Sequence, residues 1–406
     1  MADHCLYRNP SNGVIICTYV DDFLIIGPNM KDIDVVKKQL NDTFKMEDLG
    51  ACKYFLGMRV TRDRANGRLN LCQDAYIDKV TATFQIDEAD VINHTAPMSD
   101  AALVDLIKYT GKASQQDITR YQQAIGCIMY AMLQTRPDLA FSVSKLSRFS
   151  SNPSSSHWKY VLQTLKYLGA TRTLGITYTR NESGKLEFHG FSDSDHAGCK
   201  ETGKSTTGYV FMMANGPVSW RSRRQGPVGL SSMEAEYYAL TEAAREATWL
   251  RALLQELSYN KSDVHPTRIF GDNKPSHTLA KNPEFHQRSK HIAVQYHYIR
   301  NEVLAGNVVI FHIHTRWMAA DGLTKFLKNT EFQRSVELLR LDEWNEDWLE
   351  ADEGLGETEL QEQQGEYVAW KMSLPPPSTK TLLDEDNATF SVLEKIVMMD
   401  DSEIQE

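Results

Sequence analysis

Four carboxylates in the second half of the chain stand in contexts that could place them around one metal site. Asp193 ends an apolar, strand-like run, Glu236 lies near the start of a long helical segment, Asp272 closes another strand, and Asp321 follows a third. Hard divalent cations such as Mg²⁺ prefer oxygen ligands, and two of them about 4 Å apart can stabilise the attacking and leaving oxygens of a phosphodiester. These four residues therefore predict a two-metal site for phosphodiester hydrolysis.

Several motifs around these acids carry a family resemblance. They are Thr-Gly-Tyr-Val-Phe at 207–211, Val-Ser-Trp-Arg-Ser-Arg-Arg-Gln at 218–225, Leu-Ser-Ser-Met-Glu-Ala-Glu-Tyr at 230–237 and Lys-His-Ile-Ala-Val-Gln-Tyr-His-Tyr-Ile-Arg at 290–300. With acids in the order Asp, Glu, Asp, Asp on β, α, β and α elements, this region resembles the ribonuclease H domain of copia-type retrotransposon polyproteins. The resemblance implies hydrolysis of the RNA strand of an RNA–DNA hybrid, with two Mg²⁺ ions for which Mn²⁺ is an expected substitute.

Two further acids, Asp195 and Glu234, lie beside the chosen ones. By analogy with the family the first site residue is Asp193, and period-two alternation places Asp195 on the same face but beyond the strand end. Glu236 shares three-and-four spacing with the apolar residues of its helix, so it belongs to the face that packs on the sheet. Glu234 suits a first-turn position after a cap at Ser231 or Ser232.

A second signal lies near the start of the chain. Two apolar, β-branched runs at 14–19 and 23–26 meet at Val20-Asp21-Asp22, a pattern typical of a tight hairpin with carboxylates at its tip. With the helix expected at 31–44, this region resembles the palm of a reverse transcriptase of the same family. Asp21 and Asp22 would then form a residual polymerase metal site. The resemblance also implies a third carboxylate and fingers upstream, for which the residues before Tyr19 leave no room.

The region between these signals shows helical spacing. It predicts helices at 73–84, 118–133 and 157–168, which by resemblance are the thumb and connection. The predicted domains are a partial reverse transcriptase palm at 1–95, a helical thumb and connection at 96–184, a ribonuclease H-like domain at 185–330 and an acidic, disordered tail at 331–406. The expected fold class is α/β: an α+β palm remnant and helical connection, followed by a ribonuclease H-like mixed sheet with flanking helices.

The negative charge of the chain is concentrated in one segment. Of a formal net charge of -10, residues 342–366 contribute eleven acidic side chains with no Lys or Arg, which leaves the rest close to neutral. That composition, and Pro375-Pro376-Pro377 beyond it, are typical of a solvated or disordered extension. The acidity therefore does not argue against a nucleic-acid substrate elsewhere in the chain.

Basic residues near the predicted site suit an anionic substrate, or alternatively form a solvated surface. They are Arg221, Arg223, Arg224, Arg288 and Lys290. Contacts from these side chains to phosphates would give an affinity that falls steeply with salt. The expected partners are accordingly nucleic acid, in particular an RNA–DNA hybrid, and other parts of a retrotransposon polyprotein, with no membrane partner.

The histidines suggest two other chemistries. His286, His291 and His297 could indicate zinc, but their intervals do not place all three on one helical face, and no Cys or acidic ligand accompanies them. His312 and His314, at the end of the last expected strand, are candidates for proton transfer to the leaving group.

Composition favours a soluble, intracellular chain of two or three domains. It has 406 residues, 41% of them hydrophobic, and six cysteines with no Cys-x-x-Cys pair, which argues for reduced thiols. The sequence contains no apolar stretch of membrane-spanning length and no signal peptide, so cytoplasm or nucleus is the expected location. A competing hypothesis is an inactive nucleic-acid-binding remnant of a decayed element, motivated by the short palm, by His196 where the family usually has Trp, and by Pro275 after Asp272.

The short palm leads to a first prediction. We expect no reverse transcriptase activity from these residues alone, because the third carboxylate and the fingers implied by the resemblance are not among them. Primer extension on RNA and DNA templates measures this, with Asp21→Asn as the matched variant. Nucleotide incorporation that the substitution abolishes would contradict the prediction.

Overall fold

A computed structural model describes residues 2–92, 94–180, 188–257, 265–281, 298–343 and the strand at 366–372. The chain divides into two compact units. The first comprises residues 1–64, 249–264 and 346–406, and the second comprises 65–248 and 265–345. Within the described ranges, no helix combines the length and apolar character that crossing a bilayer requires.

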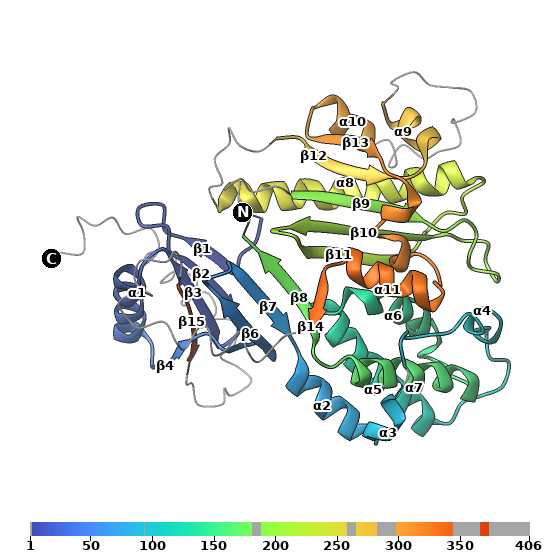
Figure 1. Ribbon diagram of the computed structural model, residues 1–406, viewed down its shortest axis with the longest axis horizontal. Helices are drawn as coiled ribbons and strands as arrows, with labels where there is room; N and C mark the ends of the chain where they lie inside the picture. The colour runs from blue at the N-terminus through green and yellow to red at the C-terminus, as the bar shows by residue number, and fades with distance from the viewer. Residues whose placement is uncertain are drawn as a thin grey trace, which may run out of the picture. The chain divides into compact units, whose positions relative to one another are not determined.

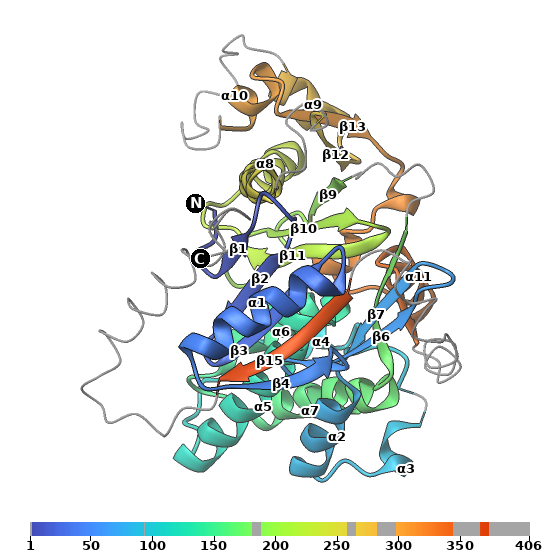
Figure 2. The ribbon, with the colours of Figure 1, turned by 90° about the vertical axis from the view of Figure 1, so that its left-hand side faces the viewer.

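The first unit is built on a five-stranded sheet of order β1-β2-β3-β15-β4. Its elements are β1 (Leu6–Arg8), β2 (Ile15–Tyr19), β3 (Asp22–Gly27), α1 (Met30–Thr43), β4 (Met46–Ala51) and β15 (Glu366–Met372), with a short hairpin of β5 (Tyr54–Phe55) and β6 (Met58–Asp63). Helix α1 buries Ile33, Val36 and Leu40 and lies across one face of the sheet (Figure 2). The hairpin expected at 14–26 is formed by β2 and β3, and the helix expected at 31–44 is α1.

Strand β15 departs from the predicted disordered tail. It pairs antiparallel with β3, from Glu366 opposite Gly27 to Lys371 opposite Asp22, and also with β4. The segment Tyr-Val-Ala-Trp has the β-branched and aromatic composition of a strand. The strands with which it pairs, β3 and β4, are far away in the sequence, so the local composition around the acidic run gave no sign of this pairing.

The second unit contains the mixed sheet expected from the sequence, in the order β11-β10-β9-β12-β13. Its strands are β9 (Phe188–Ser194), β10 (Thr206–Met213), β11 (Gly216–Arg224), β12 (Thr267–Gly271) and β13 (Val308–His312). Strands β9, β10 and β11 are antiparallel, whereas β12 runs parallel to both β9 and β13. This connectivity makes β9 and β12 adjacent parallel strands that end at the same edge.

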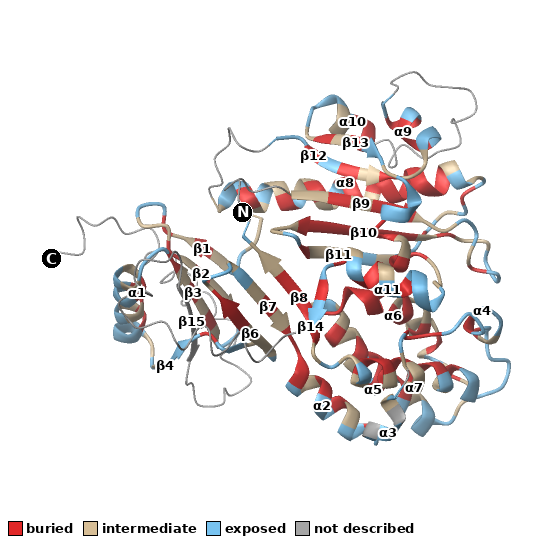
Figure 3. Ribbon diagram, viewed as in Figure 1, coloured by how far each residue is buried: buried red, intermediate tan, exposed pale blue. Residues whose placement is uncertain are grey.

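Helix α8 (Ser232–Glu256) runs along one face of this sheet (Figure 1). Its Glu246 carboxylate accepts hydrogen bonds from the hydroxyls of Tyr209 on β10 (3.1 Å) and Ser219 on β11 (2.6 Å). Helices α9 (Lys274–Lys281) and α10 (Tyr298–Leu304) connect β12 to β13. Figure 3 shows β10 buried along most of its length, as expected of an interior strand with side chains packed on both faces.

The rest of the second unit is mainly helical, as expected. The elements are β7 (Arg68–Cys72), α2 (Asp74–Thr83), α3 (Glu88–Val91), α4 (Ala102–Asp105), α5 (Gln115–Gln134), α6 (Ala140–Leu146), α7 (Ser155–Ala170) and β8 (Leu174–Thr179). Three of them match the helices expected from apolar spacing. Their buried faces form one core that also includes apolar residues of β10 and of the segment around 318–341.

The predicted tail boundary at 331 falls inside an ordered helix. Helix α11 (Asn329–Leu338) buries Phe332 and Val336, and the following strand β14 (Leu341–Glu343) pairs antiparallel with β8. The buried apolar residues tie this segment into the core of the second unit. The prediction that the tail begins at 331 is therefore wrong, because the acidic composition starts only at 342.

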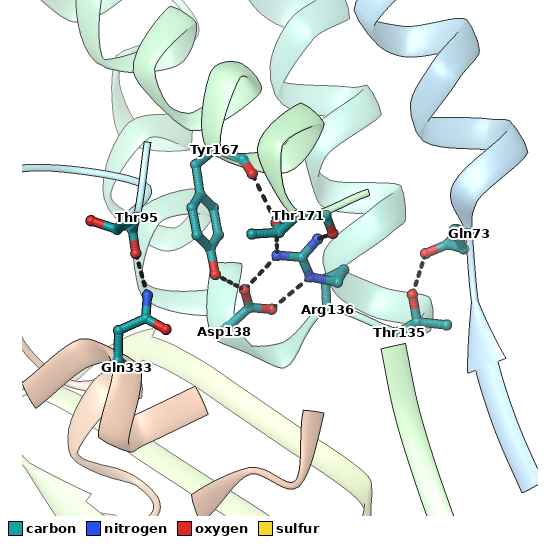
Figure 4. A network of polar contacts seen from close by, with 8 residues as sticks. All are labelled: Gln73, Thr95, Thr135, Arg136, Asp138, Tyr167, Thr171 and Gln333. Atoms are coloured by element: carbon teal, nitrogen blue, oxygen red, sulfur yellow. Dashed lines mark hydrogen bonds and ion pairs between the residues drawn. The ribbon is translucent and has the colours of Figure 1, made fainter. Parts of the chain in front are cut away.

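A buried arginine fixes the junction between α5 and α6 (Figure 4). The Arg136 guanidinium donates to both carboxylate oxygens of Asp138, at 3.0 and 2.7 Å, and to the carbonyl and hydroxyl of Thr171. The Tyr167 hydroxyl donates to the same carboxylate at 2.7 Å. Both charged side chains are inaccessible to solvent, so each depends on the other for compensation.

We expect Arg136→Met to lower the free energy of unfolding by about 3–5 kcal/mol, because it leaves the Asp138 carboxylate buried without its counter-charge. Urea unfolding measures this change. The matched control is Arg172→Met, whose ion pair with Asp78 (3.1 Å) is 52% and 55% exposed and should contribute at most about 1 kcal/mol. Equal losses in the two variants would contradict the assigned role of Arg136.

Candidate active site

Three carboxylates converge at the edge where β9 and β12 end. The parallel register places Phe270 opposite Phe191, so Asp272, two residues on, comes level with Asp193. Glu236, in the second turn of α8, reaches the same point. Each of Asp193, Glu236 and Asp272 offers a carboxylate oxygen, and these oxygens lie within 4.8 Å of one another. We call these three residues the acidic cluster.

Each member of the acidic cluster accepts a hydrogen bond that orients it. The Thr324 hydroxyl donates to Asp193 (2.6 Å), the Thr315 hydroxyl donates to Asp272 (2.6 Å), and the Ser194 backbone N–H donates to Glu236 (3.3 Å). Asp193 and Glu236 are buried, whereas Asp272 is half-buried. The carboxylates are therefore held in place while the cluster remains open on the Asp272 side.

The electrostatics of the cluster favour a bound positive charge. Burial, with the negative charges of Asp321 and Asp272 nearby, raises the pKa of Asp193 to about 7. Burial and the charges of Asp193 and Asp272 raise the pKa of Glu236 to about 10. These shifts mean that the cluster resists holding three negative charges without a cation or protons to offset them.

Asp321 is adjacent to this cluster and already has a cationic partner. It begins the 3-10 turn η6 (Asp321–Leu323), where an α-helix was expected. Its carboxylate accepts from the Lys325 ammonium at 2.9 Å. Burial disfavours the ammonium, but Asp193 and Asp321 outweigh it and raise the pKa of Lys325. The Asp321 charge thus acts on the cluster, although its carboxylate is outside the set of three converging oxygens.

A glycine lets η6 approach the sheet. Gly208 on β10 lies opposite Asp193 in the register, and a Cβ at this position would come within 2.6 Å of the Thr324 side chain and 2.9 Å of Leu323. Any side chain at 208 would displace the turn that carries Thr324. The glycine of the Thr-Gly-Tyr-Val-Phe motif is therefore required by the geometry of the site.

Asp195 and Glu234 have structural roles. The backbone N–H of Thr206 donates to the Asp195 carboxylate, which closes the end of the β9–β10 pair. The Glu234 carboxylate accepts from the Leu230 N–H and the Tyr238 hydroxyl, while the Ser231 hydroxyl accepts from the Glu234 N–H. This reciprocal arrangement caps α8 and identifies Ser231 as the cap.

Other residues singled out from the sequence lie outside the cluster. Asp21 and Asp22 are at the tip of the β2–β3 hairpin, and among the described residues the only group of three or more metal-ligand side chains is the acidic cluster. Arg221, Arg223 and Arg224 are exposed on the edge strand β11. Arg288, Lys290, His286, His291 and His297 lie outside the described residues.

The two candidate proton-transfer histidines are exposed near the site. The ring of His312 lies 6.1 Å from that of the buried His277, and the His314 ring accepts from the Arg316 N–H. No contact of either histidine with the acidic cluster is present in the described structure. Their proposed role in proton transfer stays a prediction.

Three residues of the site were missed from the sequence. Thr324 and Lys325 follow Asp321 by three and four positions in the motif Ala-Ala-Asp-Gly-Leu-Thr-Lys, the spacing at which side chains share one face of a helical turn. That spacing could have identified both. Thr315 had no comparable signal, because its contact with Asp272 depends on how the chain leaves β13.

Comparison with known proteins decides the family. The family described as reverse transcriptase (RNA-dependent DNA polymerase) matches residues 2–99. The chain is 34% identical to the retrovirus-related Pol polyprotein from transposon TNT 1-94 of Nicotiana tabacum, over 83% of this chain and 25% of that protein. It is 32% identical to a protein of transposon Ty5-1 from Saccharomyces cerevisiae, over 60% of this chain and 78% of that protein.

The chain belongs to the copia-type retrotransposon Pol family. It spans about a quarter of the length of the TNT 1-94 polyprotein. Among solved structures, the crystal structure of RNase H1 from the halophilic archaeon Halobacterium salinarum aligns with 34% of this copia-type chain and 94% of its own, at 18% identity and a TM-score of 0.26.

The raised pKa values predict how the stability of this copia-type Pol chain depends on pH. In EDTA the stabilisation that protonated Asp193 and Glu236 provide is present below about pH 4 and is lost as pH rises through about 7 and then 10. Asp193→Asn should therefore raise the melting temperature at pH 8, by roughly 2–4 °C for each kcal/mol of repulsion relieved.

Thermal unfolding in EDTA, followed by circular dichroism between pH 5 and 9, measures the effect. The control is Asp78→Asn, which removes one negative charge from an exposed carboxylate paired with Arg172 and should change the melting temperature little. A melting temperature at pH 8 that does not rise in Asp193→Asn relative to this control would contradict the assigned repulsion.

Proposed function

We propose that this chain hydrolyses the RNA strand of RNA–DNA hybrids, using divalent metal ions held by Asp193, Glu236, Asp272 and Asp321. The observation that carries the proposal is the convergence of three carboxylate oxygens within 4.8 Å at the ends of β9 and β12 and at the start of α8. Membership of the copia-type Pol family supports an RNA–DNA hybrid as the substrate.

The donor set fits a hard divalent cation. All the available donors are carboxylate oxygens, which Mg²⁺ prefers and Mn²⁺ also accepts. The raised pKa values of Asp193 and Glu236 mean that two buried carboxylates are ionised only at a cost, which a cation would offset. Bound divalent ions of this kind lower the pKa of water and stabilise the departing oxygen of a phosphodiester.

The chain's own residues prepare the site for that reaction. Thr324 and Thr315 hold Asp193 and Asp272 by hydroxyl hydrogen bonds, which keeps their oxygens turned toward one point. Lys325 places a positive charge between Asp321 and Asp193, which lowers the net repulsion that an approaching phosphodiester meets. The half-buried Asp272 lies on the open side, where the substrate must enter.

A cleavage assay on labelled RNA–DNA hybrid tests the proposal, with duplex DNA and duplex RNA as parallel substrates. We expect hybrid cleavage that requires Mg²⁺ or Mn²⁺ and is lost in Asp193→Asn, Glu236→Gln and Asp272→Asn. Asp321→Asn should be milder and partly restored by Mn²⁺. Thr324→Val should lower activity about 10–100-fold, because it removes only the hydrogen bond that orients Asp193.

Asp195→Asn is the control and should retain wild-type turnover, since the amide oxygen can still accept from the Thr206 N–H. Full activity in Asp193→Asn together with loss in Asp195→Asn would show that the wrong acid was chosen. A folded wild-type chain that binds hybrid without cleaving it would favour the inactive nucleic-acid-binding remnant.

A further inference from the structure

A tryptophan with two arginines against its ring lies on the surface near the acidic cluster. Trp317 ends the 3-10 turn η5 (Thr315–Trp317) and is 53% exposed. The guanidinium carbons of Arg316 and Arg334 lie 5.4 and 5.1 Å from the centroid of its ring. Both distances are within the range of cation–π attraction. We call Arg316, Trp317 and Arg334 the Arg–Trp group.

Among the described residues, the two guanidinium charges of the Arg–Trp group have no anionic partner. In the part of the chain that the structure describes, neither Arg316 nor Arg334 forms an ion pair. The Nε of Arg334 is buried and has no hydrogen-bond acceptor within the described ranges. Two like charges gathered at one ring repel each other, so an anion bound between them would be stabilising.

The turn that carries Arg316 and Trp317 also contributes a residue to the site, and the helix that carries Arg334 is fixed to the core. Thr315, which donates to Asp272, begins the turn that ends at Trp317, and two residues span at most about 7 Å. On α11, the Gln333 amide beside Arg334 donates to the Thr95 carbonyl at 2.6 Å (Figure 4). Trp317 therefore lies within two residues of a site contact, and both guanidiniums lie against its ring.

We propose that the Arg–Trp group binds the sugar–phosphate backbone of the nucleic acid whose scissile phosphate lies at the acidic cluster. This inference rests on the proposed function. Phosphates follow one another at about 3.4 Å of helix axis per strand, so two guanidiniums near one ring can reach neighbouring phosphates. The indole holds both in position. Such contacts set the position of the duplex and carry no sequence information.

Binding of a labelled RNA–DNA hybrid to the full chain in EDTA tests the Arg–Trp group separately from cleavage. Fluorescence anisotropy at several salt concentrations gives the Kd and its salt dependence. We expect the double variant Arg316→Gln, Arg334→Gln to bind about tenfold more weakly at 100 mM salt and to reduce the slope of log K against log salt by about 0.9 for each lost phosphate contact. Trp317→Ala should weaken binding, and Trp317→Phe should restore most of it.

The matched control is Arg245→Gln. Its guanidinium also lies over an aromatic ring, 5.8 Å from the Tyr298 centroid, but is neutralised by Glu242 at 2.8 Å. This variant should keep the wild-type Kd and salt slope. Circular dichroism melting confirms that each variant is folded, and Arg316→Gln alone, at an exposed side chain, serves if the double variant is not.

The outcomes separate this proposal from the proposed function. Wild-type Kd and slope in the folded Arg316 and Arg334 variants would overturn the Arg–Trp proposal, even if the wild type cleaves hybrid. Weaker binding in these variants supports it, even if the wild type does not cleave. Equal weakening in Arg245→Gln would show a general charge effect and would also overturn it.

Discussion

The repulsion among three carboxylates packed into one edge of a sheet is the constraint on which the second unit depends. Two of them are buried, and their raised pKa values record how unfavourable that arrangement is without a cation. The chain holds them together by rigid means. Asp193 and Asp272 come from adjacent parallel strands, and Glu236 comes from a helix fixed by Glu246 on two strands. Flexible elements would separate the charges.

A second buried carboxylate of the same unit, that of Asp138, has its charge compensated by a neighbouring guanidinium. Asp138 is as inaccessible as Asp193, yet it receives two hydrogen bonds from Arg136 and one from Tyr167. The guanidinium supplies the positive charge that offsets the burial of this carboxylate. Burial of Asp138 is compensated by Arg136, whereas the burial of Asp193 among other carboxylates is compensated only in part. The difference between these aspartates marks which of them is structural.

The sequence alone was enough to locate strands and converging residues where the local apolar pattern and the geometry of a sheet agree. Apolar runs located β9 and β12, three-and-four spacing selected Glu236, and these residues do meet. The sequence alone was not enough where the position of a segment depends on pairing with residues far away in the chain. Strand β15 pairs with β3 across more than three hundred residues, and α11 is held by a core to which distant helices contribute. The contact between Thr315 and Asp272 likewise depends on the path of a connection, which no periodicity encodes.

Asp321 shows how the path of the chain after β13 shapes the site. Had Asp321 continued into an α-helix, as its neighbours suggested, its carboxylate would be fixed by a regular backbone. The 3-10 turn instead presses against Gly208, which brings Thr324 onto Asp193 and leaves Asp321 bound to Lys325. One turn thus orients a cluster carboxylate through Thr324 and binds a further carboxylate, that of Asp321, through Lys325. Because a single, partly exposed ion pair holds Asp321, its position depends on this turn and not on the strands that position Asp193 and Asp272.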